Sequence, residues 1–257
     1  MIPKKIHYFW FSGDPLPLNI IGCMDSWKEI MPDYEIIKWD LSNTPIECDF
    51  ANKARHDKKW AFLSDYARLR VLYEHGGIYL DTDVLCVKAF DDLLDLNSFW
   101  GRANNGMVEP VVIGAQPNNK MIKNCLDVYL KKTGREDYQE IPLEILPIFK
   151  NAGFEKEKSE TQHLEDATIY SYEHFCPLPF ENADESDPKR FKTENTYAIH
   201  LWNAAWFDPF RFFWNSRRKK GWKTIGKIIL SNPFQNKQFY KNVFYHLKCG
   251  IFGYPEC

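Results

Sequence analysis

The segment that indicates the fold most directly is Gly76-Gly77-Ile78-Tyr79-Leu80-Asp81-Thr82-Asp83-Val84. The glycine pair ends a helical pattern, and the apolar run after it predicts a short buried strand over 78–80. Because side chains alternate along a strand, we expect Asp81 and Asp83 to point the same way. Two aligned carboxylates form half of a site for Mg²⁺ or Mn²⁺; the alternative interpretation is a solvated strand end.

Short apolar runs alternate with helical stretches on both sides of this segment, which is typical of an α/β sheet. The ranges expected as strands are 6–11, 34–39, 78–80, 111–114 and 197–202. The ranges expected as helices are 18–30, 59–75 and 118–132. Residues 133–195 give no clear pattern, and the acidic, polar stretch 181–195 predicts a surface loop.

Composition excludes several classes of protein. The chain has 257 residues, 44% of them apolar, and a formal net charge of −2, which argues against a dedicated nucleic-acid binder. The start lacks the apolar stretch of a signal peptide, so we expect a cytoplasmic protein. Seven cysteines without a C-x-x-C pair argue against a zinc site and for reduced thiols.

Charge is concentrated near the C-terminus. Residues 209–255 contain ten Lys and Arg and no Asp or Glu, so this stretch carries a formal charge of +10. Since the net charge of the whole chain is −2, the remainder carries −12. Aromatic residues are interleaved with these basic residues, a pattern that predicts a membrane-surface anchor on anionic lipid. The alternative is a solvated face that balances the acidic body. We therefore expect a catalytic domain over 1–208 and a basic, aromatic segment over 209–257.

The expected helix 59–75 carries a charged pair at the edge of its apolar face. Asp65 and Arg68 lie three residues apart and share that face. The alternative to a functional pair is an ordinary ion pair, which contributes a few tenths of a kcal/mol.

Two further residues end expected strands. His200 lies near the end of the expected strand 197–202, close to Asn203, and from there it can reach a metal ion held by carboxylates. Trp10 ends the first strand and can stack on a base. The alternative for both is an ordinary core residue.

Four segments follow one another in this order along the chain: Ile2-Pro3-Lys4-Lys5-Ile6-His7-Tyr8-Phe9-Trp10, Leu63-Ser64-Asp65-Tyr66-Ala67-Arg68, Gly76-Gly77-Ile78-Tyr79-Leu80-Asp81-Thr82-Asp83 and His200-Leu201-Trp202-Asn203-Ala204-Ala205-Trp206. This ordered set resembles glycosyltransferase family 32, whose members carry a DXD sugar-binding region and include bacterial capsule enzymes. The resemblance implies a GT-A fold, a Rossmann-like α/β domain with a mixed central sheet flanked by helices. It also implies a retaining, metal-dependent transfer of a hexose from a nucleotide sugar, with a UDP-sugar favoured.

The resemblance assigns a role to each matching residue. Asp65 and Arg68 would hold the donor sugar and the diphosphate. Asp81, Asp83 and His200 would ligate Mn²⁺ or Mg²⁺.

Four aromatic or amide residues would complete the donor site. Trp10 would stack on the base, Tyr79 would pack by the nucleotide, and Asn203 and Trp206 would contact the donor. The family often has Ser where this chain has Ala205, which removes one hydroxyl contact to phosphate.

Elementary chemistry supports a metal at this site. Breaking a sugar–phosphate bond builds negative charge on the departing diphosphate, which a divalent ion and Arg68 stabilise. No nucleophile is evident, so we expect a front-face transfer in which the diphosphate takes the proton of the acceptor. The resemblance to this family favours a glycan or lipid-linked oligosaccharide acceptor and a role in capsular polysaccharide biosynthesis. The basic segment 209–257 favours a peripheral location on the inner membrane face.

Two alternatives remain open from the sequence. A non-catalytic sugar-binding homologue would keep the aromatic residues. A haloacid-dehalogenase-like phosphohydrolase also has a D-x-D after an apolar strand, but usually near the N-terminus.

Overall fold

The computed structural model describes residues 1–183, 185 and 187–202, together with Trp222, Ile225, Gly226, Ile229, Leu230, Tyr240, Lys241, Val243, Phe244, Tyr245 and Leu247. Contacts divide the chain into two units, Met1–Asn203 and Ala204–Cys257. The first unit holds the sheet and the candidate site. Among the described residues of the second, Ile225 and Val243 are buried together against Trp222 and Ile229.

A seven-stranded mixed sheet forms the centre of the first unit, with the strand order β2-β1-β3-β6-β5-β8-β7. Its strands are β1 (Lys5–Phe9), β2 (Glu35–Trp39), β3 (Gly77–Leu80), β5 (Ser98–Arg102), β6 (Val108–Ala115), β7 (Gln162–His163) and β8 (Thr168–Ile169). β1 runs parallel to β2 and β3, whereas β6 runs antiparallel to β3 and β5. A second, two-stranded sheet pairs β4 (Val84–Cys86) with β9 (Ala198–His200).

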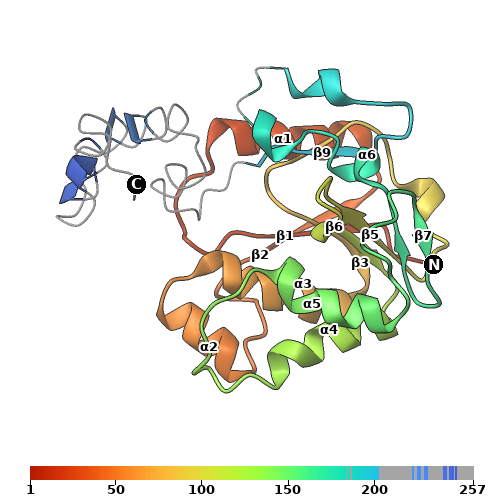
Figure 1. Cartoon of the computed structure of the whole chain (residues 1–257), viewed down its shortest axis with the longest axis horizontal. Coiled ribbons are helices and arrows are strands. Elements are labelled where there is room, and N and C mark those ends of the chain that lie inside the picture. Colours follow the sequence, from red (N-terminus) through yellow and green to blue (C-terminus); the bar gives the residue numbers. More distant parts are fainter. Residues whose placement is uncertain are drawn as a thin grey trace. The chain divides into compact units, whose positions relative to one another are not determined.

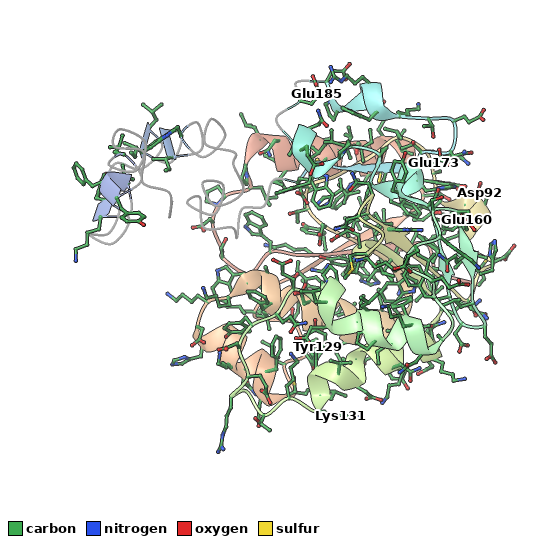
Figure 2. The ribbon with its side chains drawn as sticks, in the orientation of Figure 1. Asp92, Tyr129, Lys131, Glu160, Glu173 and Glu185 are labelled. Carbon is green, nitrogen blue, oxygen red and sulfur yellow. The ribbon has the colours of Figure 1, made fainter. Side chains whose placement is uncertain are left out.

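Helices cover both faces of the central sheet (Figure 1). On one side lie α2 (Asp49–His56), α3 (Trp60–His75), α4 (Lys120–Leu130) and α5 (Ile141–Asn151); on the other lie α1 (Leu18–Ile30) and α6 (Tyr172–Phe175). Each face has its own apolar cluster. In α4, Tyr129 points into one of these clusters and Lys131, just after the helix, points to solvent (Figure 2).

The join between α3 and β3 requires two glycines. Gly76 and Gly77 have φ of 61° and 97°, which side-chain-bearing residues rarely adopt. A Cβ on Gly77 would lie 2.8 Å from the His7 Nε2 atom and 2.9 Å from the Lys5 carbonyl oxygen. The glycine pair therefore lets β3 enter the sheet directly beside β1.

The α/β prediction with a mixed sheet flanked by helices is confirmed. The expected helices correspond to α1, α3 and α4, and the five expected strands to β1, β2, β3, β6 and β9. The last strand is shorter than predicted, because it ends at His200 and Trp202 has a φ of 52°. The stretch 181–195 contains short 3₁₀ turns, Phe180–Asn182 and Pro188–Phe191, in its described part.

Several elements had no counterpart in the sequence interpretation: α2, α5, α6, β4, β5, β7 and β8. Within the described ranges, no helix has both the length and the apolar composition needed to cross a membrane.

Candidate functional site

Two sheets meet at the D-x-D segment. The turn after β3 carries Asp81 and Asp83 and leads directly into β4, whose partner strand β9 ends at His200. The Leu201 amide donates to the Asp83 carbonyl at 3.0 Å, which holds the end of β9 beside the turn. The sequence thus brings residues 81–83 and 200 together by long-range strand pairing.

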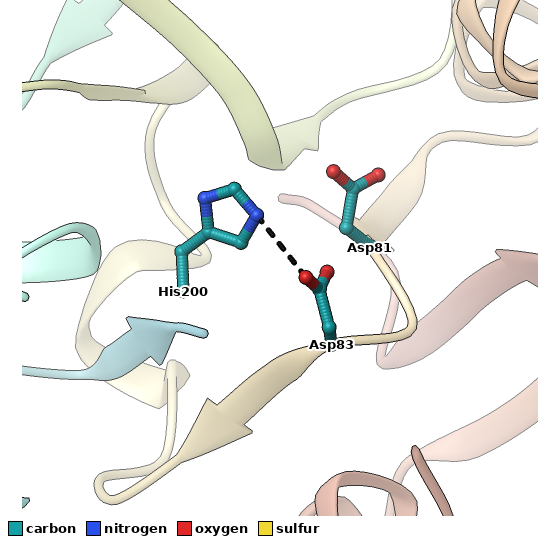
Figure 3. Close-up of side chains that lie close together, drawn as sticks. All are labelled: Asp81, Asp83 and His200. Carbon is teal, nitrogen blue, oxygen red and sulfur yellow. Dashed lines mark ion pairs between the residues drawn. The ribbon is translucent and has the colours of Figure 1, made fainter. Parts of the chain in front are cut away.

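Asp81, Asp83 and His200 form a compact set of donor atoms. One atom from each of the three side chains lies within 4.8 Å of the others, and His200 Nε2 is 3.5 Å from Asp83 Oδ2 (Figure 3). Two carboxylates and an imidazole are a ligand set that suits Mn²⁺ and also accommodates Mg²⁺. The residues present therefore fit the divalent ion that the family resemblance implies.

Arg68 of α3 joins this set to the helix layer. Its Nη2 atom lies 2.8 Å from Asp65 Oδ1 and its Nη1 atom 3.3 Å from Asp81 Oδ1. The guanidinium group also lies over the Tyr79 ring, 4.4 Å from its centroid, and the Tyr79 hydroxyl donates to Asp81. Arg68 thus holds two carboxylates and one aromatic ring at the same time.

The Asp65–Arg68 pair is not an ordinary surface ion pair. The two side chains are only 9% and 6% exposed, so the few tenths of a kcal/mol expected of an exposed pair do not apply to it. Both groups have been removed from water, which is costly unless further hydrogen bonds compensate. Arg68 receives such compensation from the Pro110 carbonyl, to which Nη1 donates at 2.8 Å.

The carboxylates at this edge outnumber the cations. Burial raises the pKa of Asp65 to about 7, although Arg68 lowers it, and burial likewise raises the pKa of Asp81 against the influence of Arg68. One guanidinium cannot keep both carboxylates fully ionised in a buried setting. A divalent ion beside Asp81 would supply the missing positive charge.

In the absence of a metal ion, the Asp83 carboxylate favours the form of His200 that carries a proton. Burial alone would lower the pKa of this imidazole, but the Asp83 charge and hydrogen bond raise it well above the ordinary value. A metal ligand must be the neutral imidazole, so metal binding displaces that proton. Metal affinity is consequently expected to fall as the pH falls.

The remaining predicted donor contacts are placed only in part. Tyr79 is 2% exposed and lies beneath Arg68. Trp10 follows β1 at the same edge of the sheet, with its Nε1 atom donating to the Asp14 carbonyl at 2.7 Å. Asn203 and Trp206 lie outside the described residues.

Two residues near the site were missed by sequence reasoning. The Trp202 ring lies 4.1 Å from the His200 ring, centroid to centroid, and its Nε1 atom donates to the Leu178 carbonyl. Glu109 is the second residue of the apolar strand β6, and its electrostatic neighbours include His200, Asp81 and Arg68. A single acidic residue inside an apolar strand pattern is the signal that could have identified it.

A family comparison agrees with this geometry. Residues 17–100 match the family described as "Glycosyltransferase sugar-binding region containing DXD motif". The match runs from α1 into β5 and includes Asp65, Arg68, Asp81 and Asp83. The predicted family is thus confirmed over residues 17–100, which match a glycosyltransferase sugar-binding region.

Individual relatives share moderate similarity with the chain. Inositol phosphoceramide mannosyltransferase 3 of Schizosaccharomyces pombe is 30% identical over 118 residues, covering 44% of this chain and 33% of that protein. Lactosylceramide 4-alpha-galactosyltransferase of Mus musculus is 27% identical over 201 residues, covering 73% of this chain and 53% of that protein. The matches thus span a third to a half of these relatives.

Among solved structures, "PaToxG Glycosyltransferase" is 20% identical, covers 58% of this chain and 68% of that chain, and has a TM-score of 0.48.

Proposed function

We propose that the protein is a metal-dependent glycosyltransferase that moves a hexose from a nucleotide sugar, with retention of configuration, and that residues 1–208 form its catalytic domain. The observation that supports this most strongly is the convergence of Asp81, Asp83 and His200 on one point, with Arg68 beside them. The match of residues 17–100 to a DXD sugar-binding region supports a nucleotide sugar as the substrate.

In this proposal each residue has a distinct task. Asp81, Asp83 and His200 hold the divalent ion, Mn²⁺ or Mg²⁺, which when bound neutralises charge on the departing diphosphate. Arg68 presents charge-assisted hydrogen bonds to the same phosphate oxygens. Asp65 orients Arg68, because the 2.8 Å contact between them leaves the guanidinium little freedom.

The names of relatives suggest the class of acceptor. The two relatives named above are, by their names, transferases that act on ceramide lipids. We propose a lipid-linked oligosaccharide or other glycan acceptor, used in polysaccharide assembly. One relative is a mannosyltransferase and the other a galactosyltransferase, so the UDP-linked donor is a proposal from the family resemblance alone.

We also propose that the protein works in the cytoplasm at the inner membrane face. The support is the basic, aromatic stretch 209–255 together with exposed apolar side chains in its described part, among them Leu230, Phe244 and Tyr245.

The test is donor hydrolysis in the absence of acceptor. The protein is incubated with a panel of UDP- and GDP-sugars with Mn²⁺, with Mg²⁺ or with EDTA, and the released nucleoside diphosphate is measured. We expect release from one donor, abolished by EDTA and by Asp83→Ala. Asp25→Ala is the matched control, since Asp25 is exposed on α1 and pairs with Lys28.

Other outcomes would decide between the alternatives. Metal-dependent nucleotide binding without hydrolysis would indicate a strict requirement for the acceptor. No release and no metal-dependent binding for any donor would favour a non-catalytic sugar-binding homologue. The phosphohydrolase alternative has lost support, because its motif belongs to a first strand and here it follows the third strand along the chain, inside a glycosyltransferase family match.

A further inference from the structure

Glu109 is held at the metal-binding edge by its own strand. It lies at the start of β6, and the next two residues are both tied to the site. Arg68 Nη1 donates to the Pro110 carbonyl at 2.8 Å, and the Asp81 amide donates to the Val111 carbonyl at 2.9 Å. These two contacts fix the backbone on which Glu109 stands relative to Arg68 and Asp81.

The Glu109 carboxylate differs from the other acidic groups of the site. Asp65 and Asp81 each contact Arg68, and Asp83 contacts His200. By contrast, the described residues provide no hydrogen bond or ion pair to the Glu109 carboxylate, although the side chain is partly buried. A partly buried carboxylate without a partner in the protein can accept hydrogen bonds from a ligand.

The main electrostatic neighbours of this carboxylate are groups of the candidate site. Burial raises the pKa of Glu109 to about 7, His200 and Arg68 lower it, and Asp81 raises it. The three charged groups that act most strongly on Glu109 are thus residues that form the candidate site.

The chemistry of the donor limits what Glu109 can contact. A carboxylate repels the negatively charged diphosphate, which belongs on the side of Arg68 and the metal ligands. Glu109 is also outside the compact set of metal-ligating atoms formed by Asp81, Asp83 and His200. Both the ribose and the transferred sugar carry hydroxyl groups, which are donors that a carboxylate binds well. The nucleoside diphosphate keeps the ribose, so a comparison of the two ligands separates these sources.

We propose that Glu109 accepts a hydrogen bond from a hydroxyl group of the transferred sugar and so determines which sugar the protein selects. This inference rests on the proposed glycosyltransferase function and names a residue for its sugar specificity. A site built to bind a hydroxyl group rejects analogues that place that group elsewhere.

The experiment compares two ligands that differ only in the sugar. Affinities for a nucleotide sugar and for the matching nucleoside diphosphate are measured by calorimetry with Mn²⁺, for the full chain and for Glu109→Ala and Glu109→Gln. We expect Glu109→Ala to weaken nucleotide-sugar binding about 10- to 100-fold, as for the loss of a hydrogen bond to a charged group. Nucleoside diphosphate binding should stay within about twofold, because Glu109 is assigned no role in holding phosphate or metal.

Glu109→Gln separates hydrogen bonding from charge. Its amide oxygen still accepts a hydrogen bond, so we expect part of the affinity to return, together with a changed preference between donor sugars that differ at one hydroxyl group. Glu74→Ala is the matched control, since Glu74 is exposed and pairs with Arg70 at the far end of α3.

Three results would overturn the inference. Equal losses for both ligands would mean that Glu109 acts through the nucleoside, the phosphates or the metal and not through the transferred sugar. An unchanged affinity for the nucleotide sugar, or an effect confined to the KM of an acceptor, would mean that it does not touch the transferred sugar. If the wild-type chain bound no nucleotide sugar at all, the proposed function itself would fail and the inference with it.

Discussion

At the scale of single residues, Arg68 contacts more of the site than any other described side chain named above. It reaches Asp65 and Asp81 with separate nitrogen atoms and covers the Tyr79 ring. Lysine keeps the charge but has one nitrogen and no planar face, so it cannot reproduce these contacts together. We expect Arg68→Lys to slow donor hydrolysis about 100-fold, comparable to the loss of one oriented electrostatic contact to the leaving group.

The same helix supplies the control for this measurement. Arg70 forms exposed ion pairs with Glu47 and Glu74, so Arg70→Lys should leave the hydrolysis rate within about twofold of wild type. A wild-type rate for Arg68→Lys would show that charge alone is sufficient at this position.

His7 makes the stability of the protein depend on pH. Trp39 Nε1, which can only donate, donates to His7 Nδ1 at 3.0 Å, so the proton of the neutral ring is on Nε2, 3.0 Å from the Gly76 carbonyl. Burial, only partly offset by that carbonyl, lowers the pKa of His7 from 6.5 to about 4. Because the unfolded chain takes up the proton first, the stability contributed by His7 is complete above pH 6.5 and is lost as the pH falls towards 4.

The resulting prediction concerns His7→Gln, whose side chain has both a donor and an acceptor. Between pH 7 and pH 5, we expect the free energy of unfolding of wild type to fall by about 2 kcal/mol more than that of the variant. Urea denaturation at the two pH values measures this difference. His56→Gln, at an exposed position, should follow wild type, and an equally steep fall in His7→Gln would contradict the assignment.

At the scale of elements, the α3–β3 join is a point where backbone and packing both require glycine. Gly77 has a φ of 97°, and an added Cβ would come within 3 Å of His7 and of the Lys5 carbonyl. We expect Gly77→Ala to lower the free energy of unfolding by about 2–4 kcal/mol, measured by urea denaturation. Gly22→Ala, on α1 with open space around it, should instead stabilise by up to about 1 kcal/mol. Equal stabilities for the two variants would disprove this account of the join.

The elements also show what the sequence could predict. Helices α1, α3 and α4 were predicted because each is long enough to show an apolar stripe, and the glycine pair marks the end of α3. α2 has only eight residues and α5 contains Pro147, so neither gives a clear helical pattern. β4, β5, β7 and β8 are short strands that are held by partners far away in the chain, which local sequence does not reveal.

The same distinction applies to the candidate site. Asp65 and Arg68 belong to α3, whose periodicity indicates which side chains share a face. Asp81 and Asp83 lie in the turn between β3 and β4, so the strand alternation expected from the sequence does not apply to them, although the apolar run before them marked the segment. Glu109 was missed because its position depends on how β6 pairs with β3 and on an irregular register between β5 and β6. His200 was a candidate from its position at a strand end, but its approach to Asp83 depends on the β4–β9 pair, which local sequence does not reveal.

At the scale of the whole molecule, charge separates the C-terminal stretch from the rest of the chain. Residues 209–255 carry a formal charge of +10, whereas the remainder of the chain carries −12. Each basic residue near an anionic membrane contributes about 1 kcal/mol to the free energy of membrane binding. We expect the full chain to bind vesicles that contain anionic lipid, to bind them less as salt increases, and to bind zwitterionic vesicles weakly. Flotation or sedimentation of the protein with vesicles measures this.

The decisive variant keeps the chain at full length and changes only charge. Replacing the four consecutive basic residues 217–220 with Gln should reduce binding to anionic vesicles about 100- to 1,000-fold, because up to about 4 kcal/mol of attraction is removed. Donor hydrolysis in the absence of vesicles should stay unchanged, since every residue assigned to the donor site lies at or before position 206. Deletion of 211–257 should abolish vesicle binding. If neither change altered it, the basic stretch would be a solvated counterpart to the acidic body, and the acceptor would reach the site by some other means than a docked membrane.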